Sequence, residues 1–279
     1  MRTRVLIPSL LVLALLAACG GDGEPAPEPT STPARTATPT PGPTATALPT
    51  ATLAPPPPTR PPPAIQPPLG GSASVISRGD TTRRAVTLTF DAGSDAGYTS
   101  QILDTLSANG IVAGFGITGR WAEQNPELLR RIVREGHELI NHTYNHGSFT
   151  GLSTGEPPLS QAQRWDQLDR TEGIVQSLTG ASTLPYFRPP YGDQDASVNR
   201  DVLARGYRYN VMWTVDSYGW RGVSTDEIVA RCLQLAAPGA IYIFHVGSAS
   251  GDGPALQRVI DGLRAAGYSF VPLSSIAPG

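Results

Sequence analysis

Apolar runs alternate with amphipathic segments from about Ser74 onward, and this alternation limits the possible folds more than any other feature. The apolar runs resemble buried strands and lie at residues 85–90, 111–117, 138–140, 207–213, 240–246 and 268–273. The amphipathic segments resemble helices and lie at residues 98–110, 126–136, 160–180, 195–206, 225–236 and 254–267. Repeated strand–helix units with apolar strands predict a parallel sheet covered by helices, either open or closed into a barrel.

Glycines mark the ends of several of these helices. The residue just past a helix often adopts a left-handed conformation, which glycine reaches without steric cost. Glycines at such positions are Gly110, Gly136, Gly180, Gly206 and Gly267. They predict where the preceding helices stop.

The first twenty residues have the pattern of a secretory signal. Arg2 and Arg4 give a charged start, and the apolar run that follows to Ala18 is too short for a comfortable membrane span. The small residues before Cys19 resemble the bacterial lipobox, in which the Cys thioether is lipidated and becomes the mature N-terminus. An ordinary cleaved signal with a chance cysteine is the other interpretation. We therefore expect a signal peptide at residues 1–18 and a lipid anchor to the cell membrane at Cys19.

Residues 19–72 are expected to form a disordered linker. Of the 28 prolines in the chain, 17 lie between Pro25 and Pro68, among Thr and Ala. Such a sequence buries too little apolar surface to offset the entropy lost on ordering. The rest, 73–279, has ordinary globular composition and the length of one domain. The linker is thus expected to be a tether that carries an extracytoplasmic domain from the membrane into the cell wall.

Net charge and cysteine content narrow the choice of partners. The net charge is −2, so nothing favours a nucleic-acid partner, and no protein partner is indicated. With Cys19 used by lipid, Cys232 has no disulfide partner. Cys232 is therefore expected to be a buried core thiol.

Titratable residues lie at the ends of the predicted strands, where parallel α/β folds place their chemistry. Asp91, His142, Asp216 and His245 all occupy such positions. His146 lies four residues after His142, a spacing that one helical turn would bring to one face. A catalytic zinc site is usually tetrahedral and has three protein ligands, often two His and a carboxylate, with water in the fourth position. Two solvated His in a polar turn would show the same spacing.

Together, five short motifs resemble a known family. "TFDAG", "GHELINHTYNH", "RPPYG", "WTVDSYGW" and "IFH" match in order and spacing the motifs of the polysaccharide deacetylases, the NodB-homology carbohydrate esterases of family four. The resemblance covers essentially the whole of the predicted domain. It implies a distorted (β/α) barrel and a hydrolase that removes acetyl groups from an N-acetylated glycan polymer. It also implies a divalent metal, usually zinc, with cobalt, manganese or nickel as other options.

The resemblance assigns the central chemistry to four side chains. His142 and His146 would bind the metal. Asp91 would be the general base that activates the metal-bound water, and His245 would protonate the departing amine. A base and an acid on opposite sides of the scissile bond suit the hydrolysis of an acetamide, which has a poor leaving group.

Further positions are assigned supporting roles, and one departs from the family. Arg188 would orient Asp91, the backbone N–H near Tyr191 would help to hold the oxyanion, and Trp220 would form part of the pocket wall. The family usually has an Asp before this Trp that tunes the catalytic His, but this chain has Gly219. Asp216, three residues earlier, matches another Asp of the motif and is a candidate to orient His245.

The first motif departs at Ala92, where most members have a second Asp that is the third metal ligand. Four explanations remain open. Asp95 could supply the ligand, or could instead cap a helix or form a turn. Asp91 could contact the metal while acting as base. The metal could be held by the two His and water, or the domain could be inactive.

Peptidoglycan is the expected substrate, because it is the acetylated glycan nearest to a lipid-anchored protein on a wall-length tether. Chitin-like glycans are a related option. An esterase that removes O-acetyl groups from xylan-like polymers is the enzymatic alternative. A non-catalytic glycan-binding lipoprotein with a degenerate site is the alternative from a different class.

Overall fold

The structure is a computed structural model that describes residues 71–276. The predicted signal peptide, Cys19 and nearly all of the predicted linker lie outside the described residues. Within 71–276, no helix is both long and apolar enough to cross a membrane.

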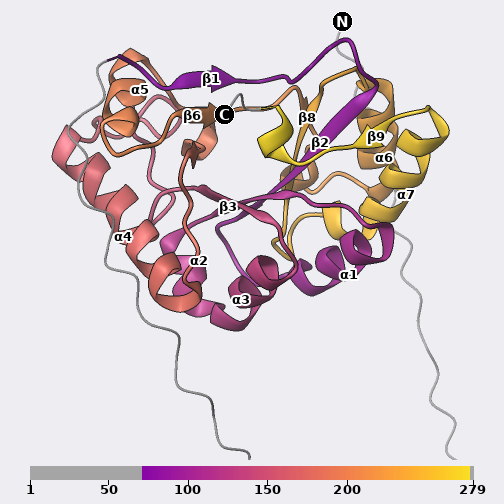
Figure 1. The fold of residues 1–279 in the computed structure, drawn as a ribbon, viewed down its shortest axis with the longest axis horizontal. Helices are drawn as coiled ribbons and strands as arrows, with labels where there is room; N and C mark the ends of the chain where they lie inside the picture. Colours follow the sequence, from indigo (N-terminus) through magenta and orange to yellow (C-terminus); the bar gives the residue numbers. More distant parts are fainter. Residues whose placement is uncertain (1–70, 277–279) are drawn as a thin grey trace, which may run out of the picture. The chain divides into compact units, whose positions relative to one another are not determined.

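Nine strands form one sheet, and all pairings between these strands are parallel (Figure 1). The strands are β1 (Ser74–Ile76), β2 (Ala85–Ala92), β3 (Gly114–Ile117), β4 (Glu138–Asn141), β5 (Tyr186–Phe187), β6 (Tyr209–Val211), β7 (Val215–Asp216), β8 (Ile241–His245) and β9 (Ser269–Phe270). Their order is β1-β6-β5-β4-β3-β2-β8-β7, with β9 also paired to β2. The end strands β1 and β7 do not pair with each other within the described chain, so the barrel is incomplete. The predicted distorted (β/α) barrel is confirmed.

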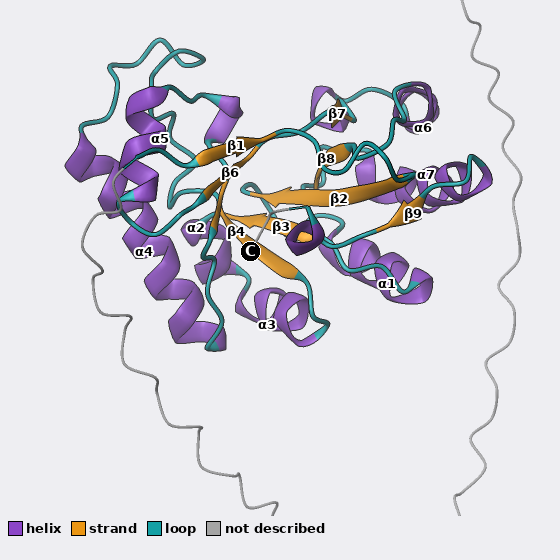
Figure 2. Cartoon of the chain, turned by 45° about the horizontal axis from the view of Figure 1, so that its top comes forward, coloured by secondary structure: helices purple, strands orange, loops and turns teal. Residues whose placement is uncertain are grey.

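Seven α-helices of the described chain surround the strands (Figure 2). They are α1 (Thr99–Asn109), α2 (Gly119–Gln124), α3 (Pro126–Arg134), α4 (Gln161–Thr179), α5 (Ala196–Leu203), α6 (Thr225–Gln234) and α7 (Asp252–Ala265). The five glycines predicted to end helices all have positive φ, between 63° and 91°. The helix boundaries predicted from these glycines are therefore correct to within a few residues.

The central strand β2 separates an apolar side from a polar one. Because successive side chains of a strand point to opposite faces, Leu88 and Phe90 pack in the main hydrophobic core toward the helices. Thr87, Thr89 and Asp91 alternate with them and face the other side of the sheet. All eight residues of β2 are buried. A carboxylate is thus placed on the concave side, at the end of a rigid strand.

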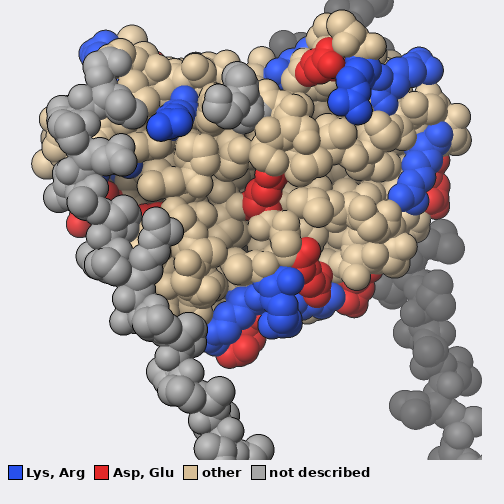
Figure 3. All heavy atoms as spheres, viewed as in Figure 1, with Lys and Arg blue, Asp and Glu red and all other residues tan. Residues whose placement is uncertain are grey.

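Surface charges of opposite sign lie beside each other, as at the lower edge of the face in Figure 3. On α3, the Arg130 and Arg131 guanidinium groups pair with Glu127, Asp104 and Glu135. Pairs of this kind at the surface, whether exposed or partly buried, contribute little to stability but keep the surface solvated.

Cys232 lies within α6 and is buried and not in a disulfide, as predicted.

Candidate active site

The predicted site residues meet in a cleft at the carboxyl ends of the strands. The cleft has a volume of about 700 Å³, within the range of about 300–1,000 Å³ that is usual for ligand pockets. Predicted residues that line it are Asp91, His142, His146, Tyr191, Asp216, Trp220 and His245. Arg188 lies behind Asp91 and is fully buried.

Asp91 and Arg188 form a buried ion pair. Asp91 Oδ1 lies 2.7 Å from Arg188 Nη1. The guanidinium also donates to Thr89 Oγ1 at 2.9 Å and to the carbonyl oxygen of Val211 at 2.8 Å. Burial acts to raise the pKa of Asp91, but the charge of Arg188, with a further contribution from His245, outweighs it and holds that pKa below its usual range. Asp91 is therefore ionised at neutral pH, as a general base must be.

The His142 ring is fixed by a bond to the backbone. Its Nδ1 lies 2.9 Å from the carbonyl oxygen of Arg188, and because a carbonyl only accepts, Nδ1 carries the proton. Burial lowers the pKa of His142 despite the charge of Asp91. The neutral ring then directs an unprotonated Nε2 at Asp91 Oδ2, 3.4 Å away.

His146 reaches the cleft through a loop, not through the helical turn that the spacing predicted. Thr143 and His146 have positive φ values of 67° and 62°, which no helix contains. Asn141 Oδ1 accepts from the Thr143 N–H, and Thr143 Oγ1 accepts from the His146 N–H, so side chains hold the turn. The rings of His142 and His146 still pack edge to face, with centroids 4.8 Å apart. Burial lowers the pKa of His146 to about 4, so its ring is neutral at neutral pH.

Asp95 does not join the histidine pair, so the arrangement seen is not the one in which Asp95 supplies the third ligand, one of the four explanations left open for Ala92. Its Oδ1 accepts from the backbone N–H of Ser248 at 2.8 Å, and its Oδ2 accepts from the Ser248 hydroxyl at 2.5 Å. Asp95 therefore fixes the loop after β8. Ala92 is fully buried and packs in the main core, so it offers no ligand either. Across residues 71–276, no three His, Cys, Asp or Glu side chains are arranged to hold a metal ion.

The residues present therefore fit a divalent ion held by two imidazoles, and not the expected three-ligand zinc site. His142 and His146 are neutral nitrogen donors, which is the form that binds metal. The backbone bond to His142 Nδ1 is also typical of metal-ligating histidines, because it fixes the ring orientation.

His245 ends β8 and lies opposite Asp91 in the register of the sheet. Burial acts to lower the pKa of His245, but Asp252, Asp91 and Asp216 outweigh it and raise that pKa above its ordinary value. The ring thus retains a proton near neutral pH, which is the state that a general acid requires.

Aromatic rings line the mouth of the cleft. Tyr191 and Trp220 are about half exposed, and Trp213 lies beside them. Asp216 accepts from the Tyr218 N–H at 2.9 Å and from Trp220 Nε1 at 3.3 Å. Asp216 therefore holds its own turn and the Trp220 ring, and its carboxylate is not hydrogen-bonded to the ring it was expected to orient.

Comparison with known proteins decides the family. The sequence profile described as "Polysaccharide deacetylase" matches residues 78–210. A peptidoglycan-N-acetylglucosamine deacetylase of Bacillus cereus is 33% identical over 201 residues, which cover 71% of this chain and 70% of the relative. The chain belongs to the polysaccharide deacetylase family.

Other polysaccharide deacetylase relatives differ in activity. The peptidoglycan-N-acetylmuramic acid deacetylase PdaA of Bacillus subtilis is 30% identical over 202 residues, covering 71% of this chain and 73% of the relative. A crystal structure of a CE4 family pseudoenzyme from Bacillus anthracis has a TM-score of 0.66 and 28% identity, covering 74% of this chain and 69% of that one. Similarity alone thus does not separate active from inactive members, and the residues in the cleft must carry the argument.

Two residues that matter to this polysaccharide deacetylase site were not predicted: Trp213, which lines the cleft, and Asp252, which is buried beside His245. Trp213 was assigned to a strand-like apolar run, where its contact with the cleft could not be seen. Asp252 lies in a Gly- and Ser-rich segment and has the position of an ordinary helix-start residue. No local signal distinguishes either residue from a structural one.

Proposed function

We propose that this polysaccharide deacetylase hydrolyses the acetamide of N-acetylated sugars in peptidoglycan. The observation that carries the proposal is that Asp91, paired with the buried Arg188, lines the same cleft as His245, whose pKa nearby carboxylates raise. Relatives named for N-acetylglucosamine and for N-acetylmuramic acid support peptidoglycan as the substrate class. Chitin-like glycans carry the same acetamide and are a second substrate class.

In the proposed reaction, Asp91 removes a proton from water while the water oxygen forms a bond to the amide carbon. Negative charge develops on the carbonyl oxygen, and the backbone N–H of Tyr191 is proposed to donate to it. His245 then transfers its proton to the amide nitrogen as the C–N bond breaks. The products are acetate and the free amine of the sugar.

A divalent ion, zinc by the family resemblance, would be held by His142 and His146, with solvent completing its shell. When bound, such an ion lowers the pKa of water and polarises a carbonyl. Because only two protein ligands hold it, we expect weak binding that dialysis against a chelator reverses.

The proposal includes a location. Cys19 would carry a lipid that anchors the chain to the bacterial cell membrane, and residues 19–72 would extend the domain outward. An extracytoplasmic domain on such a tether has access to peptidoglycan.

Acetate release from purified peptidoglycan and chitooligosaccharides tests the function. The wild-type protein is expected to release acetate with added zinc and to lose this activity with chelator. Asp91→Asn should lower the rate by at least about 100-fold, because general base catalysis is lost. Zinc content should be unchanged in this variant. Absence of release with every divalent metal tried, at micromolar protein, would contradict the proposal.

One observation favours a second candidate, a glycan-binding protein without catalysis. Ala92 removes a carboxylate that the family usually has, and a pseudoenzyme shares the fold. Binding to insoluble peptidoglycan without acetate release would support this candidate. Release of acetate from acetylated xylan but not from peptidoglycan would instead support an O-acetyl esterase.

A further inference from the structure

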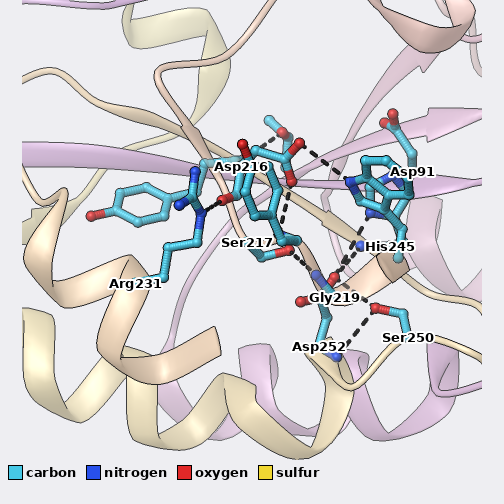
Figure 4. A network of polar contacts seen from close by, with 12 residues as sticks. Asp91, Asp216, Ser217, Gly219, Arg231, His245, Ser250 and Asp252 are labelled. Atoms are coloured by element: carbon cyan, nitrogen blue, oxygen red, sulfur yellow. Dashed lines mark hydrogen bonds and ion pairs between the residues drawn. The ribbon is translucent and has the colours of Figure 1, made fainter. Parts of the chain in front are cut away.

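A buried carboxylate lies next to His245 at the start of α7. Asp252 is fully buried, and its Oδ2 accepts from the backbone N–H of His245 at 2.8 Å and from the Ser250 hydroxyl at 2.8 Å. The same oxygen lies 3.8 Å from His245 Nδ1. In Figure 4 His245 lies between Asp252 and Asp91. One carboxylate thus contacts both the backbone and the ring of His245.

Two buried atoms at this contact have no hydrogen-bond partner among the described residues: His245 Nδ1 and Asp252 Oδ1. A hydrogen bond between such atoms spans about 2.7–3.2 Å, so at 3.8 Å the ring and the carboxylate interact through charge. Buried polar atoms without partners are costly. The ring nitrogen thus lacks an acceptor and lies beside Asp252 Oδ2, while the second carboxylate oxygen, Oδ1, lacks a donor.

Gly219 provides the space that Asp252 occupies. A Cβ added at Gly219 would lie 2.3 Å from Asp252 Oδ1, 2.5 Å from its Cγ and 2.5 Å from Ser250 Oγ. Real Cβ atoms essentially never approach other atoms this closely. Position 219 can therefore have a side chain, or Asp252 can be in its place, but both cannot be accommodated.

We propose that Asp252 is the positioning residue of His245, and that Gly219 is required to admit it. The carboxylate that the family usually has at position 219 is absent, and a carboxylate from the start of α7 takes the same space. With Nδ1–H directed at Asp252, the opposite ring nitrogen, Nε2, is left to donate its proton into the cleft. This inference rests on the proposed function only for the catalytic role of His245.

A purely structural role is the alternative that a test must exclude. An aspartate in the first turn of a helix interacts favourably with the helix dipole. Asp226 offers a matched control, since it lies in the first turn of α6. It pairs with Arg258 at 2.6 Å and its side chain is 84% exposed.

Kinetics separate the two roles through the pH profile. Asp252→Asn should lower kcat by about 10- to 100-fold, with KM nearly unchanged, as is usual when a supporting carboxylate is removed. The alkaline limb of its profile should move to lower pH, because the acid loses its proton more easily. Gly219→Asp should be impaired by the clash, and the double variant Gly219→Asp/Asp252→Ala should recover activity relative to Asp252→Ala. A wild-type pH profile in Asp252→Asn would overturn the proposal.

NMR titration of the imidazoles tests the inference without any activity. The chelator-treated wild type, Asp252→Asn and Asp226→Asn are compared, with His245→Gln to assign the signal among four histidines. Other titratable groups coupled to His245 are common to all three proteins: Asp91, Asp216, His142 and His146. Asp252→Asn should lower the His245 midpoint by about one pH unit, a tenfold loss of proton affinity. Asp226→Asn should leave it unchanged. An unchanged midpoint in Asp252→Asn overturns the inference, whereas a wild type that releases no acetate contradicts only the proposed function.

Discussion

At the scale of single residues, the stability of the domain and its expected activity both depend on the buried ion pair of Asp91 and Arg188. Arg188→Ala leaves Asp91 buried without its compensating charge. Breaking a buried pair on one side costs about 3–5 kcal/mol, so the free energy of unfolding should fall by that order. Urea unfolding at neutral pH measures the change. Activity should fall as well, because the pKa of Asp91 rises and less of it is ionised.

Two controls identify charge as the cause. Arg258→Ala breaks a solvent-exposed pair with Asp226 and should change the free energy of unfolding by less than about 1 kcal/mol. The double variant Arg188→Ala/Asp91→Asn removes both charges and should be more stable than Arg188→Ala. A double variant as unstable as the single one would show that lost packing, and not an uncompensated charge, is responsible.

The sequence predicted which residues meet in the cleft better than it predicted the contacts that support them. Asp91, His142 and His245 follow strands, so their convergence could be inferred from strand order alone. The direction of the Asp95 side chain depends on Ser248, which is 153 residues away in the chain. Asp252 was missed for the same reason, because its importance depends on the empty space at Gly219. Contacts between residues that are far apart in the chain cannot be recognised from a short sequence motif.

At the scale of secondary-structure elements, the longer strands β2 and β8 were predicted correctly and the two-residue strands β5 and β7 were not. The strands β2 and β8 have eight and five buried or nearly buried residues, enough to show an apolar run. The strands β5 and β7 have two residues each and show no period that a sequence could reveal. The histidine loop after β4 was predicted as a helical turn because helix and loop can both bring residues four apart together. The positive φ values of this loop depend on hydrogen bonds from side chains, which the spacing of apolar residues in the sequence does not reveal.

Tyr191, in the short 3₁₀ segment Pro190–Gly192, has a strained backbone and a side chain that is about half exposed in the cleft. Tyr191 has a φ of 61°, and its ring packs edge to face on His146 with centroids 4.8 Å apart. A left-handed conformation costs a non-glycine residue about 1–2 kcal/mol. Tyr191→Ala and Tyr191→Gly both remove the ring, but only the glycine variant removes the strain. Both variants should therefore raise KM for chitooligosaccharides several-fold and to a similar extent.

Stability distinguishes these two variants. Tyr191→Gly is expected to be as stable as Tyr191→Ala or more stable, by up to about 1 kcal/mol, because relief of strain is partly offset by the greater entropy of glycine in the unfolded chain. Thermal unfolding measures the difference. A glycine variant clearly less stable than the alanine variant would show that the loop is not strained at Tyr191.

At the scale of the folded domain, buried titratable groups of the site link its stability to pH. His142 and His146 are buried and have lowered pKa values, about 4 for His146. An unfolded histidine has a pKa of about 6.5, so the neutral rings contribute stability above that pH and lose it as the pH falls toward 4. Because the pKa of Asp91 is lowered in the folded state, the free energy of unfolding falls further below about pH 4, where the unfolded carboxyl binds a proton first. The raised pKa of His245 has the opposite effect: it stabilises the folded state at low pH, and this stabilisation is lost as the pH rises through the pKa of the folded state.

The chelator-treated domain should therefore be most stable near neutral pH. Between pH 7 and pH 4.5 its free energy of unfolding should fall by at least about 2 kcal/mol, because the unfolded chain binds protons at His142, His146 and the buried His137 that the folded chain excludes, while the raised pKa of His245 offsets part of this loss. Urea unfolding across this pH range measures the slope. His146→Gln removes one of these groups and should flatten the curve, whereas a variant of the surface residue Asp226 should not. The same slope in His146→Gln would show that acid acts on groups outside the cleft.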